Sequence, residues 1–98
     1  MVDTRSRLTV VVYDVSDNRR RTRLHRVLKR YGIASQLSAF EARLDRSERQ
    51  ELLAAVRPLI DPAQDRFIMY VIGPADEARI ECLGRPRPRI VQEDYYIV

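Results

Sequence analysis

The sequence predicts an α+β domain in which two helices cover one face of an antiparallel sheet, the ferredoxin-like βαββαβ plan. The predicted elements follow in the order strand, helix, two strands, helix, strand. Each predicted helix carries an apolar stripe along one side only, so each has a single face to bury. The 98 residues suffice for one domain with a modest core. We expect residues 1–83 to form this core domain and residues 84–98 to form an arm and a C-terminal strand.

The first strand is expected over residues 8–13, a short β-branched apolar run that is typical of a strand buried on both faces. Asp14 stands at its end. A carboxylate at the end of a central strand is costly unless it has a partner or a function. Asp14 therefore either caps the following helix or holds a metal ion, and spacing alone does not separate these roles.

The first helix is expected to begin near Ser16 and Asp17, with Asp17 as a cap rather than a metal ligand, and to run to about Tyr31. Its apolar residues recur at three-and-four spacing and predict a stripe that faces the core. That stripe comprises Leu24, Val27, Leu28 and Tyr31. The opposite side carries Arg19, Arg23, Arg26 and Arg30. Gly32 is placed where a helix-ending residue belongs.

The stretch 33–44 alternates apolar and polar residues but changes phase near Ser38. Because a strand cannot change faces without a turn or bulge, we expect two short strands joined tightly there. Asp45 and Glu48 have the spacing of a capping box and predict a second helix. Its apolar stripe comprises Leu52, Leu53, Val56, Leu59 and Ile60. Pro58 removes an internal hydrogen bond, so we expect it to kink the last turn.

The remaining chain predicts a buried strand over residues 67–72, a helical turn over 75–79 and a short strand over 80–83. Residues 84–89 alternate basic residues with proline, which suits an extended arm. The chain ends in a small apolar strand over residues 95–98. A terminal strand on a long arm can reach the sheet edge of a second copy. We therefore expect it to be exchanged in a homodimer.

The net charge is +4, and the basic residues are clustered. Seven of the eighteen lie between Arg19 and Arg30 with no acid among them, and three more lie within residues 85–89. Such clusters in a small domain favour a polyanionic partner, most often nucleic acid.

Two single residues restrict the chemistry. The lone cysteine, Cys82, allows no disulfide framework or thiolate zinc site within one chain, so we expect a buried apolar thiol in a reducing cytoplasm. His25 has no nucleophile placed near it by any motif and is expected at the surface.

No segment has the pattern of a signal peptide or a membrane span, and no membrane partner is expected.

Six short motifs keep a common order and spacing up to about Leu83: VYDVSD, RR, LKRYG, QLSAFE, LIDP and DRF. Together they resemble the CRISPR-associated "Cas-two" proteins, the small partner of the CRISPR integrase in spacer acquisition. The chain departs from that family at Leu37, where an aromatic residue is usual, and at Ala39, where valine is usual. Pro58 also replaces the usual helix former.

The resemblance implies a homodimer that binds double-stranded DNA and bridges the CRISPR integrase. For some members it also implies metal-dependent cleavage of phosphodiester bonds in single-stranded RNA or double-stranded DNA. It makes Asp14 the catalytic and metal-holding residue, with Mg²⁺ or Mn²⁺ as the cofactor. A two-fold axis could bring both Asp14 carboxylates of a dimer together around one ion.

The resemblance also implies nucleic-acid contacts at Arg20 and Arg21, a pair that could hold a phosphate bidentately. Arg23 and Arg30 belong to the same basic surface, although a solvated helix face is the alternative for each. Phe40 matches a position linked to the active region, while its periodicity favours the core. A DNA-binding adaptor without catalysis and a toxin-like ribonuclease of the same fold are the competing functions.

Overall fold

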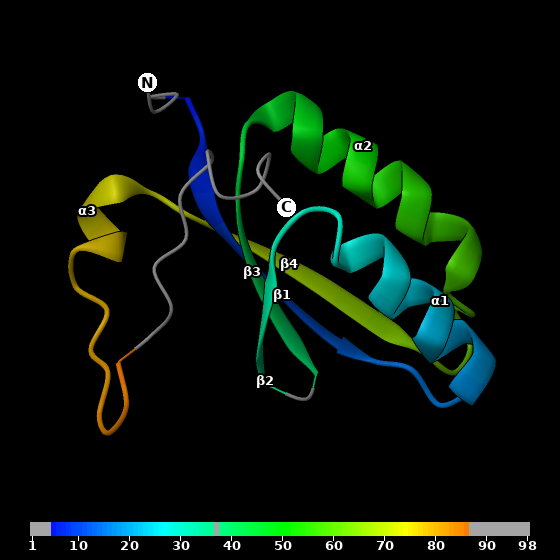
Figure 1. The fold of residues 1–98 in the computed structure, drawn as a ribbon. Coiled ribbons are helices and arrows are strands. Elements are labelled where there is room, and N and C mark those ends of the chain that lie inside the picture. Colours follow the sequence, from blue (N-terminus) through cyan, green and yellow to red (C-terminus); the bar gives the residue numbers. More distant parts are fainter. Residues whose placement is uncertain (1–4, 37, 87–98) are drawn as a thin grey trace.

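The computed structural model describes residues 5–36 and 38–86 (Figure 1). The strands are β1 (Arg7–Asp14), β2 (Ile33–Gln36), β3 (Ala39–Leu44) and β4 (Arg66–Ile72). The helices are α1 (Asn18–Leu28), α2 (Arg46–Val56), the 3-10 helix η1 (Arg57–Leu59) and α3 (Pro74–Glu77). This order confirms the predicted ferredoxin-like plan. The C-terminal strand expected to be exchanged lies outside the described residues.

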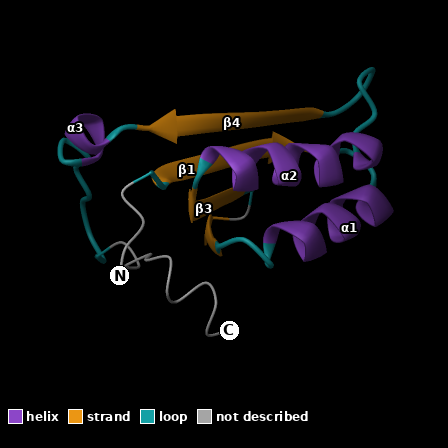
Figure 2. Ribbon diagram, turned by 90° about the horizontal axis from the view of Figure 1, so that it is seen from above, coloured by secondary structure: helices purple, strands orange, loops and turns teal. Residues whose placement is uncertain are grey.

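The strands form one sheet in the order β2-β3-β1-β4, with every neighbouring pair antiparallel. Both long helices lie on the same side of this sheet (Figure 2). The tight β2–β3 connection accounts for the phase change near Ser38, because β3 turns Phe40 and alternate residues after it toward the helices. The prediction of two short strands in place of one is confirmed.

The core lies between the sheet and the two helices. From the predicted stripes, Leu24 and Leu28 of α1 and Leu52 and Val56 of α2 are buried in it, whereas Leu53 is exposed. Asp45 and Glu48 form the predicted capping box, with the Glu48 N–H donating to Asp45 Oδ1 at 2.8 Å and the Asp45 N–H donating to Glu48 Oε1 at 2.9 Å. Pro58 lies in η1, where the helical chain tightens after Val56.

Gly32 follows the first helix as expected, but the reason for glycine is a close approach. Its φ is not positive, so no left-handed turn requires it. A Cβ built there would lie 2.1 Å from the Glu41 carbonyl oxygen and 2.7 Å from the Ala42 Cβ. The absence of a side chain therefore lets the α1–β2 connection pack directly on β3.

In the described part of the chain, helices cover only one face of the sheet, and this makes two predictions of burial wrong. On the uncovered face, Val12 of β1 is 40% exposed and Tyr70 of β4 is 52% exposed. β4 is an edge strand with β1 as its neighbour. An antiparallel sheet can leave one face to solvent, so an apolar run does not prove burial on both sides.

Two further predictions near the C-terminus are wrong. Residues 80–83 form no strand, and Leu83 is 98% exposed. Cys82 is exposed rather than buried. A short segment becomes a strand only when a sheet edge supplies hydrogen bonds, and residues 80–83 pair with no strand of the described chain.

Candidate metal and nucleic-acid site

The site is built around the end of β1 and the turn that leads into α1. We call the sheet face opposite α1 and α2 the open face. Because side chains alternate along a strand and Val11 and Tyr13 pack in the core, Asp14 points to the open face. Asp14 is exposed, and within residues 5–36 and 38–86 its carboxylate makes no hydrogen bond or ion pair. The Asp14 carboxylate is therefore not used in any bond within the described part of the chain.

The helix cap is Asp17, as predicted, and the alternative that Asp14 caps α1 is wrong. The Arg20 N–H donates to Asp17 Oδ2 at 2.9 Å, and Asp17 has the extended backbone typical of an N-cap. This bond and the nearby charges of Arg19 and Arg20 lower the pKa of the Asp17 carboxyl. The cap therefore remains a carboxylate and leaves Asp14 outside the helix.

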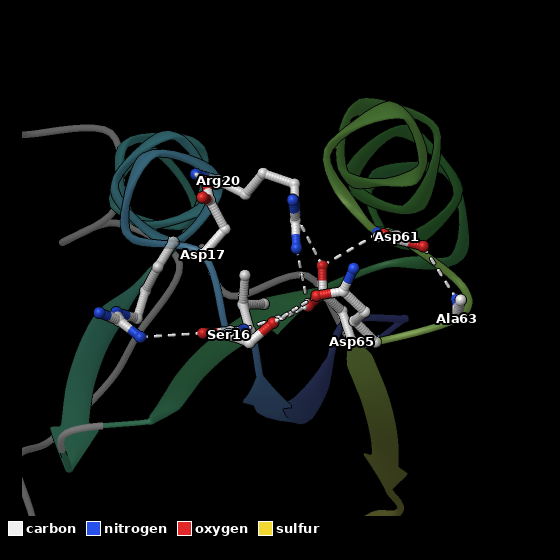
Figure 3. A network of polar contacts seen from close by, with 9 residues as sticks. Ser16, Asp17, Arg20, Asp61, Ala63 and Asp65 are labelled. Atoms are coloured by element: carbon white, nitrogen blue, oxygen red, sulfur yellow. Dashed lines mark hydrogen bonds and ion pairs between the residues drawn. The ribbon is translucent and has the colours of Figure 1, made fainter.

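A buried carboxylate, Asp65, joins the turn after β1 to the loop before β4 (Figure 3). Arg20 donates to it through Nε at 2.9 Å and Nη2 at 3.2 Å, forming an ion pair. The backbone N–H groups of Ser16 and Asp61 donate to it at 3.1 and 2.9 Å. The Arg20 guanidinium, followed by the Asp61 N–H, holds the pKa of Asp65 well below its usual range. The Asp65 side chain is fully buried, and these donors compensate its charge.

Sequence reasoning did not single out Asp65. Its only signal was its place in the DRF motif, because the turn after β1 and the loop before β4, which it connects, lie far apart in the sequence. Ser16 reinforces the connection through Oγ, which donates to Gln64 Oε1 at 3.2 Å. The network fixes the conformation of the turn that follows Asp14.

The predicted phosphate-binding pair, Arg20 and Arg21, takes part in the same local structure. Arg20 is held by Asp65, which raises the pKa of its guanidinium. Arg21 donates through Nη1 to the Val15 carbonyl oxygen at 2.9 Å and through Nη2 to Asn18 Oδ1. The structure therefore gives both side chains intramolecular partners, and their contacts with nucleic acid stay predictions.

Two other residues of the predicted basic surface, Arg23 and Arg30, are exposed around α1. Their position suits contact with a polyanion and equally suits a solvated helix face.

Phe40 lies in the core, as its periodicity predicted, with 3% of its surface exposed. Its ring centroid is 6.2 Å from that of Tyr13 and 5.1 Å from that of His25, which meets it edge to face. His25 is consequently half-buried rather than at the surface. Phe40 faces the helices, whereas Asp14 faces the other side of the sheet. Any support that Phe40 gives to an active region therefore acts through the packing of β1 and β3.

The donors near Asp14 decide how well a metal fits. Among the described residues, no three His, Cys, Asp or Glu side chains gather to hold an ion. Asp17 is engaged as a cap, Asp61 Oδ1 accepts from the Ala63 N–H at 2.9 Å, and Asp65 is buried. Mg²⁺ in proteins often takes one or two carboxylates and completes its shell with water. Asp14 fits as one such ligand, and a second carboxylate would come from another chain.

Residues 7–80 match the family described as CRISPR associated protein Cas2. CRISPR-associated endoribonuclease Cas2 3 of Chloroflexus aurantiacus is 47% identical over 62 residues, which cover 63% of this chain and 67% of that protein. CRISPR-associated endonuclease Cas2 2 of Thermus thermophilus is 38% identical over 78 residues, or 80% of this chain and 82% of that protein.

Among solved structures, a hypothetical protein from Thermus thermophilus superimposes with a TM-score of 0.75 and 38% identity, over 86% of this chain and 99% of that one. The crystal structure of Streptococcus pyogenes Cas2 at pH 6.5 gives a TM-score of 0.65 and 30% identity, over 79% and 99%. No helix in the described part of the chain is both long and apolar enough to cross a membrane.

Proposed function

Because the chain belongs to the CRISPR-associated Cas2 family, we propose that it is a spacer-acquisition protein: a homodimer that binds double-stranded DNA and bridges the CRISPR integrase. We further propose that it cleaves phosphodiester bonds in DNA or RNA with the help of a divalent metal. The names of the relatives, which are endonucleases and endoribonucleases, support the nuclease activity.

The observation that carries the proposal is the exposed Asp14 carboxylate on the open face. It stands at the end of β1, an inner strand of the sheet, directly before the basic helix α1 in the chain. The Asp65 network holds the following turn, so the position of Asp14 does not depend on a flexible loop. A fixed carboxylate can hold a divalent ion that activates water for phosphodiester cleavage.

A homodimer would complete the site. The open face also carries the exposed apolar side chains Val12, Ile33 and Tyr70, which a second copy could cover. A two-fold axis through this face would place two Asp14 carboxylates near each other. Without a cation the two negative charges would repel each other. When bound, Mg²⁺ or Mn²⁺ supplies an activated water and offsets negative charge on the phosphate.

A second candidate function is a DNA-binding adaptor without catalysis. It is favoured because Asp17, Asp61 and Asp65 are engaged in structural bonds. Of these neighbouring aspartates, each chain then has Asp14 alone to bind a metal ion. In this reading the same dimer and basic surface hold duplex DNA for the integrase, and Asp14 is a residue of the dimer interface.

A nuclease assay on wild type and Asp14→Asn, with and without Mg²⁺, tests the proposal. Asp76→Asn is the matched control, because Asp76 is an exposed aspartate in α3. We expect wild type and Asp76→Asn to cleave only with metal, and Asp14→Asn to fall to the metal-free background. Equal cleavage by Asp14→Asn would refute the metal site. If wild type binds duplex DNA and supports spacer uptake but never cleaves, the adaptor function is correct.

A further inference from the structure

The sheet brings a basic residue to Asp14 that lies far from it in the sequence. In the antiparallel pairing of β1 with β4, Asp14 is directly opposite Arg66. Residues opposite each other on neighbouring strands point to the same face, with Cβ atoms about 4.5–5.5 Å apart. Arg66 is therefore the β4 neighbour of Asp14 on the open face.

The side chain of Arg66 is not engaged by the described part of its own chain. It is exposed, and across residues 5–36 and 38–86 it makes no hydrogen bond or ion pair. Its carboxylate neighbour Asp14 is also exposed, yet the two form no ion pair. The preceding residue, Asp65, has the opposite environment, since it is buried and held by Arg20. One short segment thus fixes the turn through Asp65 and presents a cation through Arg66.

We propose that Arg66 binds the phosphate backbone of the nucleic acid beside Asp14. This inference rests on the proposed function, since it names a contact at that same site. The guanidinium matches phosphate oxygens in a planar, bidentate geometry, and its charge persists at any physiological pH. The sequence motif suggested Arg20 and Arg21 for this task, but both have partners within the chain. In a two-fold dimer through the open face, an Arg66 would accompany each Asp14.

The competing role for Arg66 is that of a counter-charge which merely stabilises the Asp14 carboxylate. An exposed ion pair of this kind contributes little to stability, and the structure shows no such pair. The two roles differ in one measurable respect. A phosphate contact releases counterions when DNA binds, whereas a counter-charge to Asp14 leaves the salt dependence of DNA binding unchanged.

The test is the binding of a fluorescently labelled, random-sequence DNA duplex by anisotropy, over a series of salt concentrations in EDTA. The proteins are wild type, Arg66→Gln, Arg66→Lys and the control Arg79→Gln, which removes an exposed arginine that follows α3. We expect Arg66→Gln to weaken binding. The slope of log K against log salt should become shallower by about 1 for each Arg66 in contact. Arg66→Lys and Arg79→Gln should keep the wild-type slope.

Each outcome bears on one proposal. If wild type binds and Arg66→Gln keeps the wild-type affinity and slope, the role of Arg66 is refuted while DNA binding stands. If Arg79→Gln lowers the affinity for DNA as much as Arg66→Gln does, the loss of affinity comes from net charge alone and the inference is also refuted. If wild type does not bind the duplex at any salt concentration, the proposed function itself fails. Thermal unfolding should be unchanged in both Arg66 variants, because Arg66 makes no hydrogen bond or ion pair within the described residues, and Arg66→Ala provides a second neutral variant.

Discussion

Replacing Gly32 with alanine tests how closely the α1–β2 connection packs on β3. The added Cβ would lie 2.1 Å from the Glu41 carbonyl oxygen and 2.7 Å from the Ala42 Cβ, far inside the 3.4 Å at which ordinary contact begins. The nearest obstacle is backbone, which cannot rotate away as a side chain could. Overpacking of this kind costs up to about 3 kcal/mol. The stiffer unfolded chain offsets about 0.5–1 kcal/mol of that cost.

We therefore expect Gly32→Ala to lower the free energy of unfolding by about 2 kcal/mol. For a domain of this size, that corresponds to a fall in Tm of roughly 8–16 °C. Calorimetry or circular dichroism measures it, at one protein concentration for all variants, because dimerisation makes Tm concentration-dependent.

Gly73→Ala is the matched control. Gly73 has a φ of −73°, and a Cβ built there meets no atom within 4 Å. The same substitution should change stability by no more than about 0.5 kcal/mol at this position. If Gly32→Ala unfolds at the temperature of wild type or of the control, the close approach of Gly32 to β3 is incorrect.

Two further substitutions test the site and the core beneath it. Asp65→Asn removes a carboxylate whose pKa in the fold is held below its ordinary value of 3.8 by Arg20. The carboxylate therefore stabilises the fold completely above pH 3.8, and this stabilisation is lost as the pH falls toward the lowered pKa. In urea unfolding, the difference in the free energy of unfolding between wild type and Asp65→Asn should thus be largest near neutral pH and shrink below pH 3.8. If this difference does not depend on pH, the ion pair with Arg20 is contradicted. Phe40→Leu should lower the free energy of unfolding by about 1 kcal/mol through lost ring contacts with Tyr13 and His25, with DNA affinity unchanged. A loss of DNA affinity without a loss of stability would instead assign Phe40 to the nucleic-acid site.

The features that the sequence predicted correctly are local. The apolar stripe of α1, the Asp17 cap and the capping box of Asp45 and Glu48 each involve residues within one or a few helical turns. Their patterns are set by the 3.6-residue period and by unsatisfied N–H groups at helix ends. The phase change near Ser38 is local in the same sense, since side chains alternate along any strand. The order of these elements was enough to predict the ferredoxin-like plan.

The candidate site was only half predictable, because only part of it depends on residues that are close in the sequence. Asp14 was identified from the sequence because it interrupts an apolar run. The ion-pair partner of Arg20 and the cross-strand neighbour of Asp14 were not, because they lie in the loop before β4 and at the start of β4. No local pattern records which of several arginines will find a buried carboxylate and which will remain exposed.

The sequence by itself determined the two long helices, the four strands of the sheet, the helix caps and the clustering of positive charge, since each depends on neighbours along the chain. Only the tertiary structure decided that helices cover a single face of the sheet, that Asp65 binds Arg20, and that Arg66 stands opposite Asp14. These outcomes depend on strand order and register. Both are fixed when distant segments pack together, so residues that are remote in the sequence become neighbours in the site.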